Sequence, residues 1–433
     1  MTKSSTIFFL FVLLIAGMMN ACSPTAKLLQ AKHEYALPDS ALAKEHYGVA
    51  LYDITDGKYL YQYNSSKYFI PCSNTKLFTL YTAMKTLGDS IPAAKIAVHK
   101  DTVFVVPTGD PTFLNDNFSS QPFLRYLKQF NVVCLVDAPQ QFSAYAQGWA
   151  WDDYSYSFMP ERSVFPIYSN VLRFYKEGSN IKSVPPLSYR FSENANVQIA
   201  RDIHSNNFYT DKNNSLQDSF TTQKIPFITS LNTVAAFLRD TLNNPNVVVM
   251  DAAKLSNLSF QYVYAQAADV FYASMMYRSD NFLAEQLLLM SSYKQLGVMN
   301  DTAMIRYATA QVLSDMPQRL RWVDGSGLSR YNLCTPEDLV YVLLQTEKDF
   351  GWNRLTAILP TGGTGTLKKY FLDQKEKIYA KTGSLSNNFC LSGILLTNSH
   401  KKIAFSIMVN NTMRPLDVIR KEIEQYLVSL SKK

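Results

Sequence analysis

The sequence contains few histidines and no pattern of metal ligands. Its 433 residues include five histidines, and neither His-Glu-x-x-His nor Cys-x-x-Cys occurs. A zinc site and a Ser-His-Asp triad therefore have no support in the sequence. We expect no metal and no other cofactor, so any catalysis has to be carried by side chains other than histidine.

Strong charge is also missing. Charged residues make up 18% of the sequence, and the net charge of +7 is spread without a block of lysine or arginine. Such a diffuse charge gives no reason to expect a nucleic acid partner. Because 47% of the residues are apolar and 13% are aromatic, we expect a globular protein of two or three domains.

Long apolar runs are absent except near the N-terminus. Residues 7–19 form a run of thirteen apolar residues, which suits a signal-peptide core and is too short to cross a bilayer comfortably. We predict a signal peptide of the lipoprotein type over residues 1–21, because Met19-Asn20-Ala21-Cys22 resembles a bacterial lipobox. The sequence thus predicts an exported, periplasmic protein held to a membrane through a lipid on Cys22. An ordinary secretory signal with an incidental Cys22 is the alternative.

The other four cysteines lack the close spacing of a disulfide framework. They are Cys72, Cys134, Cys334 and Cys390. An even count in an exported protein permits pairing, but no pair is indicated by its position. We interpret the four as small buried hydrophobic residues.

Hydrophobic periodicity predicts an antiparallel sheet covered by helices, and therefore an α+β fold. We predict strands over residues 47–53, 58–64, 377–384, 389–397 and 403–410. Predicted helices run from Asn74 to a cap at Gly88, over 267–277, 282–296, 302–313 and 416–430, and onward from Thr335-Pro336.

Short β-rich runs, such as 102–106 and 132–136, fill the middle of the chain between clusters of Asn, Pro and Ser. We interpret residues 91–263 as an inserted β-rich region. Residues 22–90 and 264–433 then form the two parts of one domain.

The pattern Ser-x-x-Lys occurs five times, so it means little by itself. Only Ser73 begins a predicted amphipathic helix, where one turn places Lys76 on the same face and the free N–H groups favour a developing anion. Ser73 is therefore a candidate nucleophile. The alternative is an N-cap serine followed by an exposed lysine.

Two further motifs change this balance. Ser279-Asp280-Asn281 and Lys381-Thr382-Gly383 each occur once. They complete the order Ser-x-x-Lys, Ser-Asp-Asn, Lys-Thr-Gly that marks serine β-lactamases and penicillin-binding proteins. Taken singly, a surface loop and a lysine-containing strand end would explain them, but the ordered triple favours a catalytic site.

With these motifs the chain resembles the D-alanyl-D-alanine carboxypeptidase/endopeptidase family of penicillin-binding proteins, the low-molecular-mass class C type. The resemblance implies a penicillin-binding-protein/serine β-lactamase-like fold with a large β-rich insertion, here between Ser73 and Ser279. Further matching pieces are Gly109-Asp110-Pro111-Thr112, Trp151-Asp152-Asp153, Ala284-Glu285, residues 324–330 (Asp-Gly-Ser-Gly-Leu-Ser-Arg) and Ala380 to Leu385. Cys72 and Ser384 depart from the usual residues at their positions, and the 359–367 stretch is degenerate.

The groups themselves indicate a mechanism. Ser73 needs a base, and in the absence of histidine the neutral amine of Lys76 is the candidate. Burial and the charge of Lys381 would have to lower the pKa of Lys76 by about three units from about 10.4. Ser279 would relay the proton to the leaving amine, and Asn281 would contact both the substrate amide and Lys76.

The substrate-binding residues follow from the third motif and from the resemblance. Backbone N–H groups of Ser73 and Ser384 would form the oxyanion hole. Lys381, Thr382 and Ser384 would hold the substrate carboxylate, on a strand segment that includes Gly383 and Leu385. The resemblance implies that Asp153 holds the amino group of a diaminopimelate side chain, and a loop-capping aspartate is the alternative. We interpret residues 324–330 as a structural turn whose Arg330 braces the site.

The sequence therefore predicts a serine DD-peptidase that removes terminal D-alanine from peptidoglycan stem peptides or cuts their cross-links. Its expected partners are those stem peptides and, as covalent inhibitors, β-lactam antibiotics. A β-lactamase and a non-catalytic lipoprotein scaffold of the same fold are the alternatives. The intact Ser73, Lys76, Ser279, Asn281 and Lys381 argue against the scaffold.

Overall fold

The structure is a computed structural model that describes residues 34–37, 42, 44–137, 139–177, 180–186, 190–192, 199–211, 222–252 and 258–433. The predicted signal peptide and Cys22 lie outside the described residues. Among the residues that are described, no helix is long and apolar enough to cross a membrane.

A five-stranded antiparallel sheet joins the two ends of the chain. Its strand order is β14-β15-β16-β1-β2, so that β1 near the N-terminus pairs with β16 near the C-terminus. The strands are β1 (His46–Asp53), β2 (Lys58–Tyr63), β14 (Ile378–Leu385), β15 (Asn388–Leu396) and β16 (Lys402–Asn410). All five strands predicted from the sequence are confirmed to within one residue at each end.

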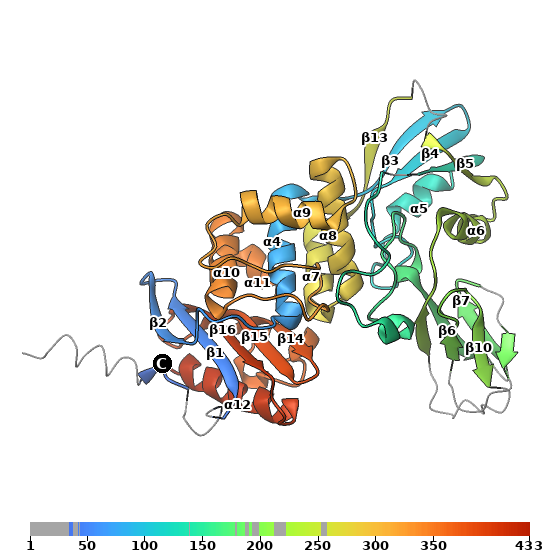
Figure 1. Cartoon of the computed structure of the whole chain (residues 1–433). Coiled ribbons are helices and arrows are strands. Elements are labelled where there is room, and N and C mark those ends of the chain that lie inside the picture. Colours follow the sequence, from blue (N-terminus) through green and yellow to red (C-terminus); the bar gives the residue numbers. More distant parts are fainter. Residues whose placement is uncertain are drawn as a thin grey trace, which may run out of the picture.

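Helices cover both faces of this sheet (Figure 1). One face carries a helical layer, and the opposite face carries the C-terminal helix α12 (Leu416–Ser431). The helices of the layer are α4 (Lys76–Thr86), α7 (Ala268–Arg278), α8 (Asn281–Leu296), α9 (Asp301–Tyr307), α10 (Pro336–Phe350) and α11 (Trp352–Ile358). The prediction of one helix over 302–313 is wrong in part, since α9 ends at Tyr307 and a π-helical turn, η5 (Ala308–Val312), follows.

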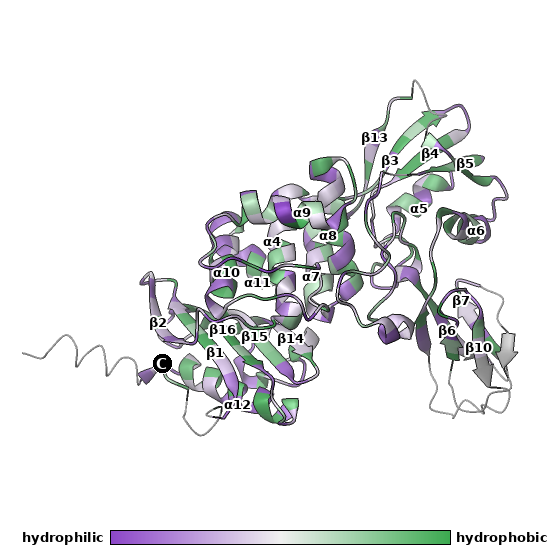
Figure 2. Cartoon of the chain, viewed as in Figure 1, coloured by the Kyte–Doolittle hydropathy of each residue, from purple (hydrophilic) through white to green (hydrophobic). Residues whose placement is uncertain are grey.

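Strand alternation explains why one sheet serves two cores. In β15, Cys390 and Ile394 join the core under the helical layer, while Phe389, Leu391 and Leu395 join the core under α12. Successive side chains of a strand point to opposite faces, so an almost wholly apolar strand is expected to be buried on both. Figure 2 shows this apolar character along the central strands.

The middle of the chain forms further sheets beyond the helical layer (Figure 1). A mixed sheet has the order β12-β5-β4-β3-β13, and two small sheets have the orders β11-β6-β7 and β8-β10-β9. Their strands are β3 (Ser90–His99), β4 (Thr102–Pro107), β5 (Val132–Val136), β6 (Val171–Glu177), β7 (Asn180–Val184), β8 (Arg190–Ser192), β9 (Ile199–Arg201), β10 (Phe208–Asp211), β11 (Gln223–Pro226), β12 (Val247–Met250) and β13 (Gln261–Ala267). The α+β class with a β-rich insertion is confirmed.

Two helices and several short helical turns complete the described elements. Helices α5 (Pro122–Leu127) and α6 (Leu231–Leu242) accompany the mixed sheet. The 3₁₀ turns are η1 (Cys72–Thr75), η2 (Trp151–Ser155), η3 (Tyr168–Asn170), η6 (Gly365–Leu367) and η7 (Leu372–Gln374). Cys72, Cys134, Cys334 and Cys390 are buried, as predicted, and none of these four forms a disulfide bond.

Candidate active site

Ser73 lies in the 3₁₀ turn η1, immediately before α4. The sequence predicted that the helix begins at Asn74, and this is wrong by two residues, because the chain makes the tighter turn first. Cys72 has a positive φ of 50°, and its carbonyl accepts a hydrogen bond from Thr75 Oγ1 at 2.8 Å. The turn leaves Ser73 half-buried while both of its neighbours are buried.

Lys76 has three polar contacts at the first residue of α4. Its Nζ lies 2.7 Å from Asn281 Oδ1, 2.7 Å from the carbonyl oxygen of Ser326 and 3.1 Å from Ser73 Oγ. The side chain is 0% exposed, so water does not compete for these contacts. A single turn of chain thus brings the amine to the serine hydroxyl.

These contacts determine which way a neutral amine would face. An amide oxygen and a carbonyl oxygen can only accept hydrogen bonds, whereas the Ser73 hydroxyl can also donate. A neutral Lys76 has two N–H donors and one lone pair. If the donors serve Asn281 and Ser326, the lone pair faces the proton of Ser73.

Burial lowers the pKa of Lys76 to about 8, because a charged amine loses its hydration in the interior. The carboxylates of Asp324, Asp280 and Glu285 oppose the shift. Burial, and after it the charge of Lys76, also lower the pKa of Lys381. Because repulsion between two like charges acts on both groups, the expected influence of Lys381 on the pKa of Lys76 stays a prediction.

The second motif forms the connection between α7 and α8. Ser279 ends α7 in the left-handed conformation with φ 55°, and Asp280 caps α8 by accepting from the backbone N–H of Leu283 at 3.0 Å. Asn281 then begins α8 beside Lys76. Its Nδ2 donates to the carbonyl oxygen of Phe158 at 3.0 Å, so the β-rich region reaches the site.

The third motif lies on β14, the edge strand of the sheet. Lys381 is 0% exposed, and its Nζ donates to Ser279 Oγ at 2.7 Å and to the carbonyl oxygen of Thr382 at 2.6 Å. The amine of Lys381 thus holds the Ser279 hydroxyl as the amine of Lys76 holds that of Ser73.

Two glycines allow the backbones around Ser73 to approach one another. A Cβ atom on Gly327, whose φ is +80°, would lie 1.9 Å from the carbonyl oxygen of Cys72. A Cβ atom on Gly383 would lie 2.8 Å from the carbonyl oxygen of Pro71. Both distances are shorter than any side chain tolerates, so these positions require glycine.

A pocket of about 500 Å³ opens over these groups. Its lining includes Ser73, Ser279, Thr382 and Ser384. Arg420 of α12 also lines it, and its Nη2 donates to Ser384 Oγ at 3.0 Å. Sequence reasoning missed Arg420, which lies in an ordinary amphipathic helix with no motif around it.

Arg420 is held in place by two further neighbours. Its Nη1 donates to Asp417 Oδ1 at 2.6 Å, and its guanidinium lies 5.3 Å from the centre of the Phe389 ring. Its planar fork of donors suits a carboxylate. A guanidinium at the pocket wall beside Ser384 adds a cation where a substrate carboxylate was expected.

The segment 324–330 is a turn held by one buried carboxylate. Asp324 accepts from the backbone N–H groups of Gly327 and Ser329 at 2.8 Å each, and from Trp149 Nε1 at 2.8 Å. Arg330 donates to the carbonyl oxygen of Ser386 at 3.3 Å. The structure agrees with the interpretation of this segment as a support, and it also supplies the Ser326 carbonyl that contacts Lys76.

Two further predicted residues, Leu385 and Asp153, do not line the pocket over Ser73. Leu385 is half-buried and packs against the core under the helical layer. Asp153 is half-buried in η2 and is not among the residues that line the pocket over Ser73. Burial, and then the neighbouring Asp152, raise the pKa of Asp153.

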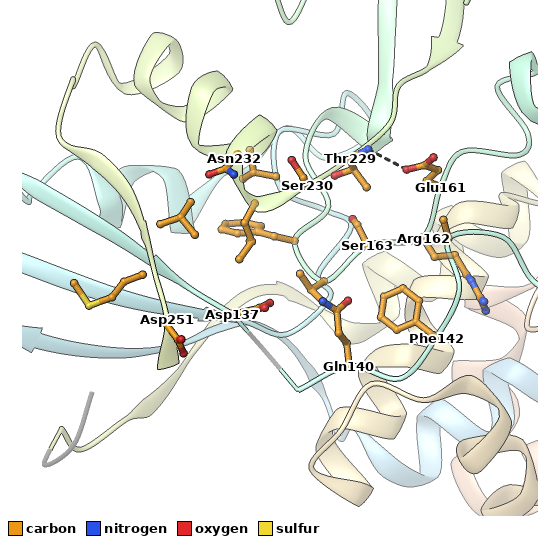
Figure 3. A pocket seen from close by; sticks show the side chains of 17 residues that line it. Asp137, Gln140, Phe142, Glu161, Arg162, Ser163, Thr229, Ser230, Asn232 and Asp251 are labelled. Atoms are coloured by element: carbon orange, nitrogen blue, oxygen red, sulfur yellow. Dashed lines mark hydrogen bonds between the residues drawn. The ribbon is translucent and has the colours of Figure 1, made fainter. Parts of the chain in front are cut away.

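A larger pocket, of about 680 Å³, lies in the β-rich region and contains none of the predicted site residues (Figure 3). Glu161, Thr229, Asn232 and Asp251 are among the residues that line it. Ser73 and Ser279 therefore line the smaller of these two pockets, together with Thr382 and Ser384 of the third-motif strand.

Comparison with known families decides the assignment. A family described as "D-Ala-D-Ala carboxypeptidase 3 (S13)" matches residues 29–235 and 269–432. The chain belongs to this family. The family resemblance inferred from the sequence motifs is confirmed, and the protein is a serine-type D-Ala-D-Ala carboxypeptidase/endopeptidase of the S13 family.

Two curated relatives and one solved structure illustrate the family. The chain is 23% identical to "Penicillin-sensitive carboxypeptidase A" of Dictyostelium discoideum, with 88% of this chain and 86% of the relative covered. It is 24% identical to "D-alanyl-D-alanine carboxypeptidase DacB" of Haemophilus influenzae, with 83% and 84% covered. The crystal structure of penicillin binding protein 4 (dacB) from H. influenzae has a TM-score of 0.71 at 20% identity, covering 91% of this chain and 98% of that one. This last likeness supports the fold.

Proposed function

We propose that Ser73 is the nucleophile that forms the acyl-enzyme, with Lys76 as its base. The observation that carries this proposal is the set of contacts of Lys76 Nζ. Two partners that can only accept lie at 2.7 Å, and the Ser73 hydroxyl lies at 3.1 Å. Together with a pKa of about 8, these contacts leave a lone pair for the serine proton at mildly alkaline pH.

The next steps use the second and third motifs. Ser279, whose oxygen accepts from Lys381, gives its own proton to the leaving amine. The proton that Lys76 took from Ser73 replaces it, so that Lys76 is neutral again. The backbone N–H groups of Ser73 and Ser384 stabilise the oxyanion, each contributing about 3 kcal/mol. Water then hydrolyses the ester on Ser73 and restores the enzyme.

The substrate carboxylate binds at the end of the pocket that Thr382, Ser384 and Arg420 line. Lys381, which precedes Thr382 on β14, is expected to act on the same carboxylate. The substrate is a peptidoglycan stem peptide ending in D-alanine, or a cross-link between two stems, and β-lactams acylate Ser73 in its place. Gly383 and Leu385 supply backbone on the strand that faces the substrate, and Asp153 receives the amino group of the stem's third residue.

We also infer export and anchoring from the N-terminal sequence. The signal peptide is residues 1–21, and lipidated Cys22 anchors the protein to a membrane on the periplasmic side. Residues 22–90 and 264–433 form the transpeptidase-like domain, and residues 91–263 form the insertion. Mass spectrometry of the mature N-terminal peptide tests the anchor, because diacylglycerol on Cys22 is the expected result and an unmodified N-terminus contradicts it.

The experiment for the enzymatic proposal is product analysis on purified peptidoglycan fragments. With the unaltered protein, mass spectrometry should show loss of terminal D-alanine or cleavage of D-alanine cross-links. With the Ser73→Ala variant it should show neither product. The lifetime of a penicillin adduct separates the alternatives. It is long for the peptidase and short for a β-lactamase, and a scaffold forms no adduct.

A further inference from the structure

Two neighbouring residues of the β-rich region face in opposite directions. Glu161 lies at the larger pocket and accepts a hydrogen bond from the backbone N–H of Thr229 at 2.9 Å. The Arg162 side chain runs past Phe142, with its guanidinium directed away from Glu161 (Figure 3). That guanidinium reaches the helical layer, where it contacts residues of α8 and α9.

The Arg162 guanidinium is buried and hydrogen-bonded on every nitrogen. Nη1 donates to Asp301 Oδ2 at 2.6 Å and to Glu285 Oε2 at 3.3 Å. Nε and Nη2 donate to the carbonyl oxygen of Ser143 at 3.2 and 2.8 Å. The side chains of Arg162 and Glu285 are 1% and 0% exposed, so solvent cannot replace either partner.

Glu285 connects Arg162 to Lys76 through Ser326. Its Oε1 accepts from the backbone N–H of Ser326 at 2.7 Å. The carbonyl oxygen of the same Ser326 accepts from Lys76 Nζ at 2.7 Å. Three consecutive contacts therefore lead from Arg162 through Glu285 and Ser326 to Lys76.

We propose that Arg162 is a positioning residue for acylation, which holds the carboxylate of Glu285 so that the Ser326 carbonyl keeps the Lys76 amine aimed at Ser73. This rests on the proposed role of Lys76 as the base. The inserted region then affects acylation indirectly. Arg162 does not touch Ser73 or Lys76, and acts on them through Glu285 and Ser326.

The charges around Glu285 give the proposal a measurable consequence. Burial, followed by Asp324 and Asp301, raises the pKa of Glu285 to about 7, whereas Arg162 and the hydrogen bond from Ser326 lower it. Glu285 in turn raises the pKa of Lys76, as do Asp324 and Asp280. Loss of Arg162 should therefore raise the pKa of Glu285 further, so that Glu285 stays neutral to a higher pH and the pKa of Lys76 falls.

The test is the rate of acylation by a fluorescent penicillin, measured against pH in the full-length protein. In Arg162→Met, the maximal rate should fall about tenfold, because the amine is no longer held in place. The rise of the rate with pH should move to lower pH by about half a unit. Glu285→Gln, which keeps an acceptor for Ser326, should show the same direction of shift with a smaller loss. Arg162→Lys should recover most of the maximal rate.

Arg173→Met is the matched control, because Arg173 also belongs to the β-rich region but makes a half-exposed ion pair with Asp116 at 3.1 Å. It should change neither the rate nor its pH dependence. If the acylation rate of both Arg162→Met and Glu285→Gln rises over the same pH range as that of the unaltered protein, or over a higher one, the proposal is overturned and Arg162 is a purely structural residue.

A second readout separates this proposal from the proposed function. If the unaltered protein takes up no penicillin, the role of Ser73 is contradicted. NMR titration of the Lys76 amine still tests the contacts from Arg162 to Lys76, because a lower pKa in Glu285→Gln and in Arg162→Met is expected and an unchanged pKa in both contradicts the proposal.

Discussion

The Nζ of Lys76 donates a hydrogen bond to Oδ1 of Asn281 at 2.7 Å, although the two residues lie 205 positions apart in the chain. The contact joins the first motif to the second across the helical layer. It also uses one donor of the amine on a partner that cannot give a proton back. The orientation of the Lys76 amine therefore depends on α8 as much as on α4, which carries the residue.

Replacement of the base should abolish acylation. Lys76→Arg keeps a positive charge and hydrogen-bond donors, but arginine is not deprotonated in proteins and cannot accept the Ser73 proton. Labelling with a fluorescent penicillin measures the loss. Lys85→Arg, on the same helix and in an exposed ion pair with Asp349, is the control and should label normally. Measurable acylation of Lys76→Arg would refute Lys76 as the base.

The pH dependence of acylation follows from the pKa of Lys76. Burial lowers this pKa to about 8, and only the neutral amine can accept a proton. The rate should therefore rise with pH through about pH 8, and fall about tenfold per pH unit below it. Stopped-flow measurement of penicillin acylation between about pH 6 and pH 9 checks this. A rate that does not change across this range would show that no group of such a pKa controls acylation.

Arg420 should determine how strongly the enzyme prefers a free carboxylate. Arg420→Gln removes a guanidinium that lines the pocket beside Ser384. The loss of a charge-assisted contact of about 1.5 to 3 kcal/mol should lower kcat/KM for an acyl-D-Ala-D-Ala peptide about ten- to a hundredfold. The same peptide with an amide in place of its C-terminal carboxylate should be hydrolysed by Arg420→Gln at the rate seen with the unaltered protein.

The control for that prediction is Lys421→Gln, which removes the same charge from the next, exposed position of α12. It should leave both substrates unaffected. An equal loss on the carboxylate and on the amide in Arg420→Gln would mean that Arg420 supports Ser384 and does not read the carboxylate.

Asp153 is predicted to select stems that carry a free amino group at their third residue. Asp153→Asn should lower turnover of such stems about ten- to a hundredfold, because a charge-assisted hydrogen bond is lost. A simple acyl-D-Ala-D-Ala substrate and penicillin binding should be spared. Asp152→Asn, the exposed neighbour, serves as the control. Equal loss on every substrate would mean that Asp153 only supports the fold.

Gly327→Ala should disrupt the turn that carries Ser73. The added Cβ would lie 1.9 Å from the carbonyl oxygen of Cys72, so η1 has to move and acylation should be lost. Gly88→Ala is a matched control, since Gly88 also has a positive φ but nothing lies within 4 Å of the added atom. It should cost about 1 kcal/mol of unfolding free energy and leave acylation intact. Normal acylation by Gly327→Ala would contradict the packing described.

The secondary structure near the site could be predicted because its residues follow local rules. The Thr335 side chain accepts from the backbone N–H of Asp338, and the Asp338 carboxylate accepts from the backbone N–H of Thr335. Four consecutive residues therefore determine where α10 begins. The strands β15 and β16 could also be predicted from local sequence, because each is a continuous run of mostly apolar residues. The end of α9 was mispredicted, because the periodicity that continues through Ala308–Val312 does not distinguish a π-helical turn from an α-helix.

The site was predictable only where a residue type carries the chemistry. A serine and a lysine one turn apart, and the two later motifs, indicate reacting groups by their identity. The carbonyl of Ser326 has no such signature, since every residue has one. Arg420 reaches Ser384 from 36 positions away, and Arg162 reaches Glu285 from 123 positions away. Tertiary packing alone creates these contacts, so periodicity and spacing give no sign of them.

Peptide mapping of the protein after reaction with benzylpenicillin tests the central claim most directly. The account predicts a single penicilloyl adduct on the peptide that contains Ser73, and no adduct in the Ser73→Ala variant, whose cooperative unfolding should be retained. An adduct on any other serine, or an unmodified Ser73 in a folded protein, would contradict the assignment of the nucleophile.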